Sequence, residues 1–164
     1  MQHDHIDWNQ YRDLCERLVA RVGASGWEFD SLLCLAHGGM RPGDIFSRVY
    51  SKPLAIMTTS SYREAAGTVQ GDLDIAKYIT GVSELKGKLL LVDDLCDSGA
   101  TIKKVVEHLK RNYPQITEIR VAVIWVKACS VFHPDYSVVY IMAKFKRILL
   151  KLSGESLMGK QSFG

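Results

Sequence analysis

Apolar residues recur along the chain in two alternating patterns, one typical of helices and one typical of strands. A helical pattern follows Asp7, whose carboxylate can cap a helix, and it ends at Gly23. The inner face of this helix is predicted to hold Trp8, Tyr11, Cys15, Leu18, Val19 and Val22. The apolar run at 31–36 then predicts a buried strand, which a Gly-Gly pair interrupts.

The alternation continues along the rest of the chain. A second helix is predicted to begin near Pro42, because proline suits a first turn, with Ile45, Phe46 and Val49 facing inward. Further strands are predicted at 54–59, 88–93, 119–126 and 136–142, and a further helix at 101–112. The polar stretch 62–84, which contains three glycines, predicts a long mobile loop with a partial helix.

Strand and helix patterns that alternate in this way predict an α/β fold, with a mainly parallel, twisted sheet and helices on both faces. A chain of 164 residues suits one domain, so we expect a single domain over 1–164. Sheets of this kind bind ligands beyond the carboxyl ends of their strands, where we therefore expect the chemistry to lie.

Composition narrows the functional classes. Hydrophobic residues make up 47% and charged residues 24%, as in ordinary globular proteins. No stretch approaches the ~18 apolar residues needed to span a bilayer, and the first residues lack the features of a secretion signal. The four cysteines (Cys15, Cys34, Cys96 and Cys129) form no CxxC pair, so we expect reduced thiols in a cytoplasmic protein.

The net charge of +3 is unevenly distributed. Residues 144–164 hold five basic residues and one acidic residue, so 1–143 carry a net charge of −1. This nearly neutral body gives no case for nucleic-acid binding. The basic segment also contains a helical apolar face: Ile141, Phe145, Ile148, Leu149 and Leu152. It predicts either a helix packed on the body or a weak contact with an acidic membrane surface.

One stretch combines a buried strand with a cluster of polar groups. It reads Leu89-Leu90-Leu91-Val92-Asp93-Asp94-Leu95-Cys96-Asp97-Ser98-Gly99-Ala100-Thr101, a strand, an acidic turn and the start of a helix. The backbone N–H groups of 98–101 favour a phosphate dianion, and the Ser98 and Thr101 hydroxyls add donors. Gly99 lets the backbone approach closely. The two adjacent carboxylates suit vicinal sugar hydroxyls or Mg²⁺, whereas the absence of a GxxxxGK[ST] motif excludes a Walker-type loop.

This stretch resembles the signature with which the type I phosphoribosyltransferases bind phosphoribosyl pyrophosphate. Within that family the chain is most similar to the bacterial xanthine-guanine phosphoribosyltransferases, over about 32–138. The match over the whole stretch favours a ligand site over an ordinary acidic turn. The resemblance implies that Asp93 and Asp94 bind the ribose hydroxyls, with Asp94 nearest Mg²⁺, and that Asp97 exchanges a proton with the purine N7. The residues expected to surround the 5′-phosphate are Asp97, Ser98, Gly99, Ala100 and Thr101.

Three further segments fall where this family has functional loops. The run His37-Gly38-Gly39 corresponds to the pyrophosphate loop, at a strand end followed by a helix. The pair Ser61-Tyr62 precedes the catalytic lid, expected at about 62–84. Lys127 corresponds to the lysine that contacts the exocyclic O6 of the purine.

The chain departs from the family in two places. Relatives usually carry arginine where His37 stands; histidine is only partly charged at neutral pH, which predicts weaker and pH-dependent pyrophosphate binding. Arg41 is either the missing cation or a solvated residue at a helix start. In the divergent segment 139–164, Phe145 falls on the base-stacking position, but lysines replace a neighbouring aliphatic residue and an acid. Phe145 is therefore either the base platform or a core residue, and base selectivity stays open.

The resemblance implies a single phosphoribosyltransferase domain with a small C-terminal hood, assembled as a homodimer or tetramer. It implies Mg²⁺-dependent transfer of phosphoribose to N9 of guanine, xanthine or hypoxanthine, in purine salvage, with release of pyrophosphate. Two alternatives stay open: a phosphoribosyltransferase for another base, such as a pyrimidine, and a regulator that senses phosphoribosyl pyrophosphate without turnover. Lys127 and the Ser61-Tyr62 pair favour a 6-oxopurine, and the near-neutral body argues against such a regulator's nucleic-acid surface.

Overall fold

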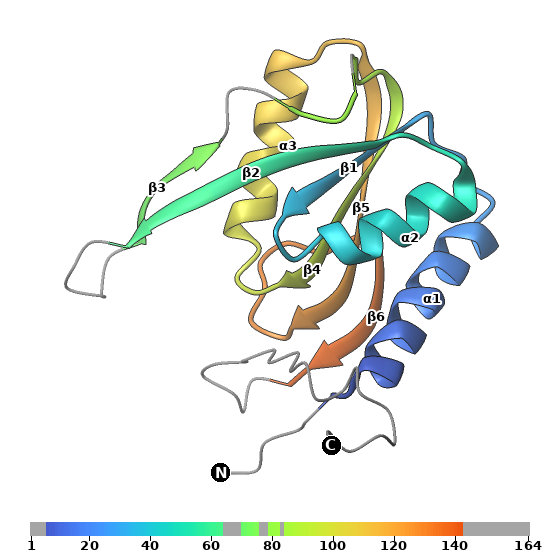
Figure 1. Cartoon of the computed structure of the whole chain (residues 1–164). Helices are drawn as coiled ribbons and strands as arrows, with labels where there is room; N and C mark the ends of the chain where they lie inside the picture. The colour runs from blue at the N-terminus through green and yellow to red at the C-terminus, as the bar shows by residue number, and fades with distance from the viewer. Residues whose placement is uncertain (1–5, 64–69, 76–78, 83, 143–164) are drawn as a thin grey trace, which may run out of the picture.

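The computed structural model describes residues 6–63, 70–75, 79–82 and 84–142, with the backbone alone described for 60–63 and 70–75. The elements are α1 (Trp8–Ala24), β1 (Ser31–Ala36), α2 (Met40–Tyr50), β2 (Leu54–Arg63), β3 (Gln70–Ile75), β4 (Gly87–Cys96), α3 (Ala100–Asn112), β5 (Ile116–Lys127) and β6 (Tyr136–Ile141) (Figure 1). The start of α1 is confirmed by a capping box. The Asp7 carboxylate accepts from the Gln10 N–H at 2.8 Å, and the Gln10 side chain accepts from the Asp7 N–H at 2.9 Å.

The strands form one sheet in the order β3-β2-β1-β4-β5-β6. Every neighbouring pair is parallel except β2 and β3, which are antiparallel. The carboxyl ends of β1, β4, β5 and β6 therefore lie along the same edge of the sheet (Figure 1). The predicted mainly parallel α/β fold is confirmed, and this edge is where ligands bind in such sheets.

Helices cover both faces of the sheet, and each face has its own apolar core. On one face, α1 and α2 pack against β1, β4, β5 and β6. On the other face, α3 packs against β5, with fully buried Ile102, Val105 and Leu109 pointing toward the sheet. The central strands β1 and β4 are sandwiched between these layers, so their apolar runs are buried on both sides. Among the described residues, no helix has both the length and the apolar character required to cross a bilayer.

Two predictions about the elements were wrong. Val49, expected to face inward, is 60% exposed. The inward face of α2 runs from the buried Phe46 to the partly buried Tyr50. The Tyr50 hydroxyl donates to the Val19 carbonyl of α1 at 3.1 Å, so Val49 is turned toward solvent.

The stretch 62–84 is not simply a loop with a partial helix. β2 continues to Arg63, and β3 pairs with it antiparallel, with Thr59 opposite Ile75. A polar strand is tolerated here because β3 is at the end of the sheet and pairs on one side only in the described part of the chain. Residues 64–69, 76–78 and 83 lie outside the description.

Candidate active site

The carboxyl end of the central strand β4 holds two adjacent carboxylates. Burial, and then the neighbouring charge of Asp94, raise the pKa of Asp93 to about 8. Burial also raises the pKa of Asp94. The Asp94 N–H donates to Asp93 Oδ1 at 2.9 Å, so one carboxylate oxygen of the pair already has a hydrogen-bond donor from the backbone. Two carboxylates in such surroundings favour a ligand that supplies positive charge or hydroxyl donors.

These carboxylates fit Mg²⁺ only in part. Among the described residues, no group of three or more His, Cys, Asp or Glu side chains is arranged to hold a metal. Mg²⁺ commonly takes one or two protein carboxylates and completes its shell with water and substrate phosphates. Asp94 could therefore hold Mg²⁺ together with a bound diphosphate, but the described residues by themselves offer no closed metal cage.

The loop between β4 and α3 surrounds a small hollow of about 120 Å³. Its lining includes Asp93, Leu95, Cys96, Asp97, Ser98, Gly99, Thr101 and Ile102. The N-cap residue of α3, Gly99, has φ 81° and no side chain with which to cap the helix. The Ser98 hydroxyl accepts from the Ala100 N–H at 3.3 Å. The other N–H groups of the first turn have no side-chain acceptor among the described residues, which suits an anion.

The loop that follows β1 lies directly against β4. A Cβ on Gly38 would collide with the Asp94 carboxylate, and a Cβ on Gly39 would collide with the Val92 carbonyl oxygen. Only glycine fits at either place, so the close approach of the two loops depends on both residues. The predicted pyrophosphate loop and the predicted ribose carboxylates are thereby brought together. The Ala36–His37 peptide bond within this loop is cis.

The two candidate pyrophosphate cations lie in different surroundings. His37 is exposed at the end of β1. The Arg41 guanidinium lies over the indole ring of Trp8 in α1, 4.2 Å from the ring centroid. Arg41 is exposed, and this cation–π contact gives it a partner outside the loop, so both interpretations of Arg41 stay open.

Lys127 and Asp97 form an ion pair of 2.7 Å between Nζ and Oδ1. Lys127 ends β5, and Asp97 directly follows β4, its parallel neighbour. The lysine side chain is only 11% exposed, whereas the aspartate side chain is 60% exposed. The two residues expected to contact the base thus lie side by side at the edge of the sheet.

Some candidate residues lie outside the description. The backbone of Ser61 and Tyr62 lies in β2, but their side chains are outside the description. Phe145 falls in 143–164, outside the described residues, together with most of the basic segment.

One contact of the site was not anticipated from the sequence. The Val131 N–H donates to the Ser98 carbonyl at 3.0 Å, and the neighbouring Ser130 and Phe132 pack against Gly99. No motif marks these residues, because the contact joins positions about thirty residues apart. The only sequence signal is their place just after the end of β5.

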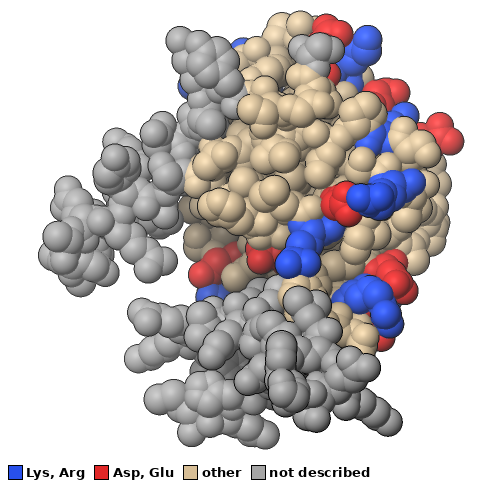
Figure 2. Space-filling model, viewed as in Figure 1, with Lys and Arg blue, Asp and Glu red and all other residues tan. Residues whose placement is uncertain are grey.

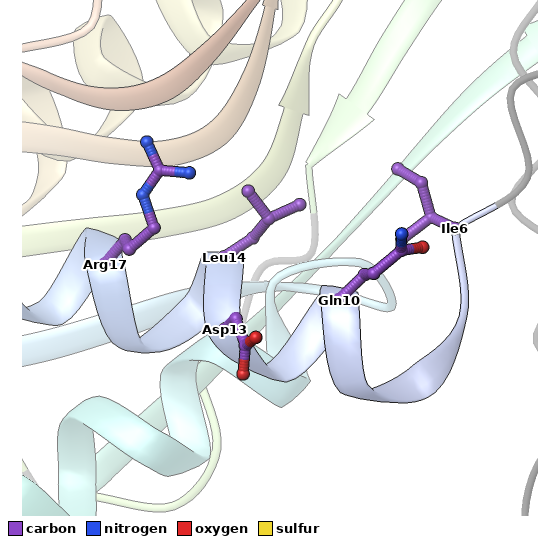
Figure 3. A pocket seen from close by; sticks show the side chains of 5 residues that line it. All are labelled: Ile6, Gln10, Asp13, Leu14 and Arg17. Atoms are coloured by element: carbon purple, nitrogen blue, oxygen red, sulfur yellow. The ribbon is translucent and has the colours of Figure 1, made fainter.

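A larger hollow of about 350 Å³ lies apart from this site. Its described lining is Ile6, Gln10, Asp13, Leu14 and Arg17, all in or just before α1 (Figure 3). None of the candidate residues at the sheet edge lines it, so it carries none of the chemistry described above.

Comparison with known proteins agrees with this geometry. Residues 7–148 match the family described as the phosphoribosyl transferase domain. A purine phosphoribosyltransferase from Pyrococcus horikoshii Ot3 has 23% identity and a TM-score of 0.70, covering 92% of this chain and 99% of that one. The Helicobacter pylori xanthine-guanine-hypoxanthine phosphoribosyltransferase has 22% identity and a TM-score of 0.73, covering 91% and 92%. An orotate phosphoribosyltransferase from Aeropyrum pernix has 21% identity and a TM-score of 0.58, covering 82% and 73%. At these identities the likenesses show the shared fold.

Proposed function

Because this chain belongs to the phosphoribosyl transferase domain family, and is therefore a pentosyltransferase, we propose that it transfers phosphoribose from phosphoribosyl pyrophosphate to N9 of a 6-oxopurine in purine salvage. The observation that carries the choice of base is the Lys127–Asp97 pair, with 2.7 Å between Nζ and Oδ1. An ammonium donor beside a carboxylate acceptor matches the purine edge, where the O6 acceptor lies next to N7. A base bound there would replace each partner of the ion pair with its own polar atom.

The remaining residues of the site would each bind one part of phosphoribosyl pyrophosphate. The 5′-phosphate would bind the N–H groups at the start of α3, where the cap residue Gly99 has no side chain to compete for them. The ribose hydroxyls would donate to Asp93 and Asp94, whose pKa values are raised chiefly by burial. The pyrophosphate would lie at Gly38 and Gly39, next to Asp94.

Mg²⁺ would be held by Asp94 together with oxygens of the substrate, and the chemistry it supplies is neutralisation of charge on the departing pyrophosphate. The protein's own contribution is to hold the reacting groups in line. The bond between C1′ and pyrophosphate breaks as the bond between N9 and C1′ forms, and positive charge develops on the ribose and the base. Asp97 would stabilise the protonated purine and accept its N7 proton. The 62–84 segment is proposed to be the lid that excludes water.

Two alternatives make different predictions. The fold is shared with an orotate enzyme, so a pyrimidine acceptor would use the same phosphate loop with another base site. A sensor of phosphoribosyl pyrophosphate would bind it without turnover and would be expected to carry a basic surface. On the face shown in Figure 2, the described acidic and basic side chains are interspersed rather than gathered into such a surface.

The test is a turnover assay with phosphoribosyl pyrophosphate, Mg²⁺ and a panel of bases, following both pyrophosphate release and nucleotide formation. We expect turnover with guanine, xanthine or hypoxanthine and none with orotate. Turnover with orotate alone would establish the pyrimidine alternative. Binding of phosphoribosyl pyrophosphate without turnover of any base would establish the sensor.

A further inference from the structure

Residues 130–132, which follow β5, form a wall against the loop proposed to bind the 5′-phosphate. The Val131 N–H donates to the Ser98 carbonyl at 3.0 Å. A Cβ on Gly99 would lie 2.7 Å from the Ser130 hydroxyl oxygen and would collide with Phe132. At Ser98 and Gly99 the phosphate loop therefore contacts this wall through its backbone.

The Ser130 hydroxyl is the centre of the wall. Ser130 is 9% exposed, and its hydroxyl donates to the Phe132 carbonyl at 2.8 Å and accepts from the Phe132 N–H at 3.2 Å. The same oxygen lies 3.1 Å from Cys96 Sγ, at the end of β4. The Ser130 N–H donates to the Lys127 carbonyl at 2.9 Å. One buried residue thus connects the ends of β4 and β5 with the turn that supports Ser98.

We propose that Ser130 is a positioning residue that holds the 5′-phosphate loop in its binding conformation; this inference rests on the proposed function. The loop needs such support because N–H groups bind a phosphate well only when they converge on one point. Gly99 leaves the backbone free to move and has no side chain with which to cap α3. Within the loop, the Ser98 hydroxyl accepts from the Ala100 N–H at 3.3 Å, a long hydrogen bond at an exposed position. The contacts from the wall supply the further order that the loop needs.

The test compares Ser130→Ala with Ser31→Ala, a matched control at the opposite end of the sheet. Ser31 is also 9% exposed, and its hydroxyl also donates to one carbonyl and accepts from one N–H, both of Lys86, at 2.8 and 3.0 Å. Titration calorimetry would measure the affinity for ribose 5-phosphate and, separately, for Mg²⁺-pyrophosphate. Circular dichroism would establish that both variants are folded at the assay temperature.

We expect Ser130→Ala to weaken ribose 5-phosphate binding about 10-fold, the usual effect of losing a buried hydrogen bond that orders a binding group. Pyrophosphate affinity should change less than 2-fold, and Ser31→Ala should change neither affinity. Unchanged ribose 5-phosphate affinity in Ser130→Ala would overturn the inference. Equal losses of affinity for ribose 5-phosphate and for pyrophosphate would also overturn it. Such losses would indicate a general loss of stability, which affects the loops after β4 and β1 alike.

A second variant removes the other contact of the wall. Val131→Pro deletes the N–H that donates to the Ser98 carbonyl, at a residue that is 78% exposed. It should weaken ribose 5-phosphate binding in the same way, and it replaces Ser130→Ala if that variant does not fold. No ribose 5-phosphate binding by the unsubstituted chain would overturn the proposed function and this inference together. Normal binding by the parent and by both variants would overturn the inference alone.

Discussion

At the scale of the residue, the Lys127–Asp97 ion pair places one buried cation and one exposed anion where the base is proposed to bind. The lysine side chain is 11% exposed and the aspartate side chain 60%. A largely buried ammonium group depends strongly on the partner it finds, whereas an exposed carboxylate is also solvated by water. We therefore expect the two residues to contribute to binding and turnover in different ways.

Lys127→Ala should weaken binding of guanine, xanthine or hypoxanthine while sparing ribose 5-phosphate. A lost hydrogen bond to a charged group costs about 1.5–3 kcal/mol, or roughly 10- to 150-fold in affinity. Equilibrium binding of base in the presence of ribose 5-phosphate measures the effect. Lys110→Ala, on the exposed end of α3, is the control. An unchanged base affinity in Lys127→Ala would rule out the 6-oxopurine assignment.

Asp97→Asn should leave binding of phosphoribosyl pyrophosphate nearly intact, because the backbone N–H groups of the loop are proposed to contribute most of the phosphate binding. Turnover should fall roughly 10²-fold or more, the usual contribution of a positioned acid–base group. Steady-state kinetics beside direct binding separates the two effects. Equal losses in both would show that Asp97 supports the loop rather than the chemistry.

His37→Arg should tighten pyrophosphate binding at neutral pH and reduce its pH dependence. A histidine gains positive charge as the pH falls through the neutral range, whereas an arginine is charged throughout. The measurement is pyrophosphate affinity between about pH 6 and pH 8, for variant and parent in the same buffers, because pyrophosphate itself also titrates. Identical pH profiles would show that His37 does not touch the ligand, and Arg41 would become the cation to replace.

At the scale of the element, the junction of β4 and α3 depends on a backbone that only glycine adopts easily. Gly99 has φ 81°, and a Cβ there would also collide with Phe132. Gly26, at the end of the α1 turn, has φ 69° but no atom within 4 Å of the Cβ position. Substitution of Gly26 therefore tests the conformational cost of a side chain alone, whereas substitution of Gly99 adds the cost of overpacking.

Gly26→Ala should lower the free energy of unfolding by about 1 kcal/mol, the cost of placing a side chain in the left-handed region. Gly99→Ala should lower it by roughly 2–4 kcal/mol and should also abolish ribose 5-phosphate binding, because the overpacked wall and loop must move apart. Urea denaturation and calorimetry measure the two effects. Equal losses of unfolding free energy for the two variants would show that the wall moves aside at no cost in stability.

At the scale of the whole molecule, the carboxylate pair makes stability depend on pH. Burial and Asp94 raise the pKa of Asp93 from 3.8 to about 8. Between these values the folded state retains a proton that the unfolded chain has lost, so the free energy of unfolding falls as the pH rises through this window. The destabilisation is complete above about pH 8 and absent below about pH 4.

Asp93→Asn should therefore be more stable than the parent at pH 8, and this difference should shrink as the pH falls toward 4. Asparagine keeps an acceptor for the Asp94 N–H, so the bond at 2.9 Å can persist. Urea denaturation at several pH values, without ligand or divalent ions, provides the comparison. Glu28→Gln, an exposed carboxylate in the α1–β1 connection, controls for the loss of one charge. Parallel curves for Asp93→Asn and parent would contradict the pKa shift.

The fold was predictable wherever the relevant pattern is local. The period of apolar residues located α1 and the buried strands because both depend on neighbours a few positions away. The orientation of Val49 was not predictable, since it depends on Tyr50 finding a carbonyl on α1. β3 was missed because a polar strand at the sheet end is specified by its pairing with β2 and not by its own sequence.

The candidate site divides in the same way. Its phosphate loop is a contiguous motif, so Asp93, Asp94 and Asp97 could be singled out from the sequence. The approach of Gly38 to Asp94 follows from two parallel strands being neighbours, which a motif alone does not specify. Ser130 could not be found, because its importance lies in a single hydroxyl that packs against residues distant in the chain.

The place of β1 between β2 and β4 also has a consequence for synthesis, because its two partner strands leave the ribosome at different times. Leu32 pairs with Leu54 on one side and with Leu90 on the other. At about 5–20 residues per second, a ribosome needs several seconds after making β1 to supply its second partner. During that interval the nascent chain carries an apolar strand with one open edge, the kind of surface that chaperones cover and that aggregates form on. Since Asp93 and Asp94 arrive on that late strand, the proposed sugar-phosphate site cannot form in a nascent chain before β4 has been made.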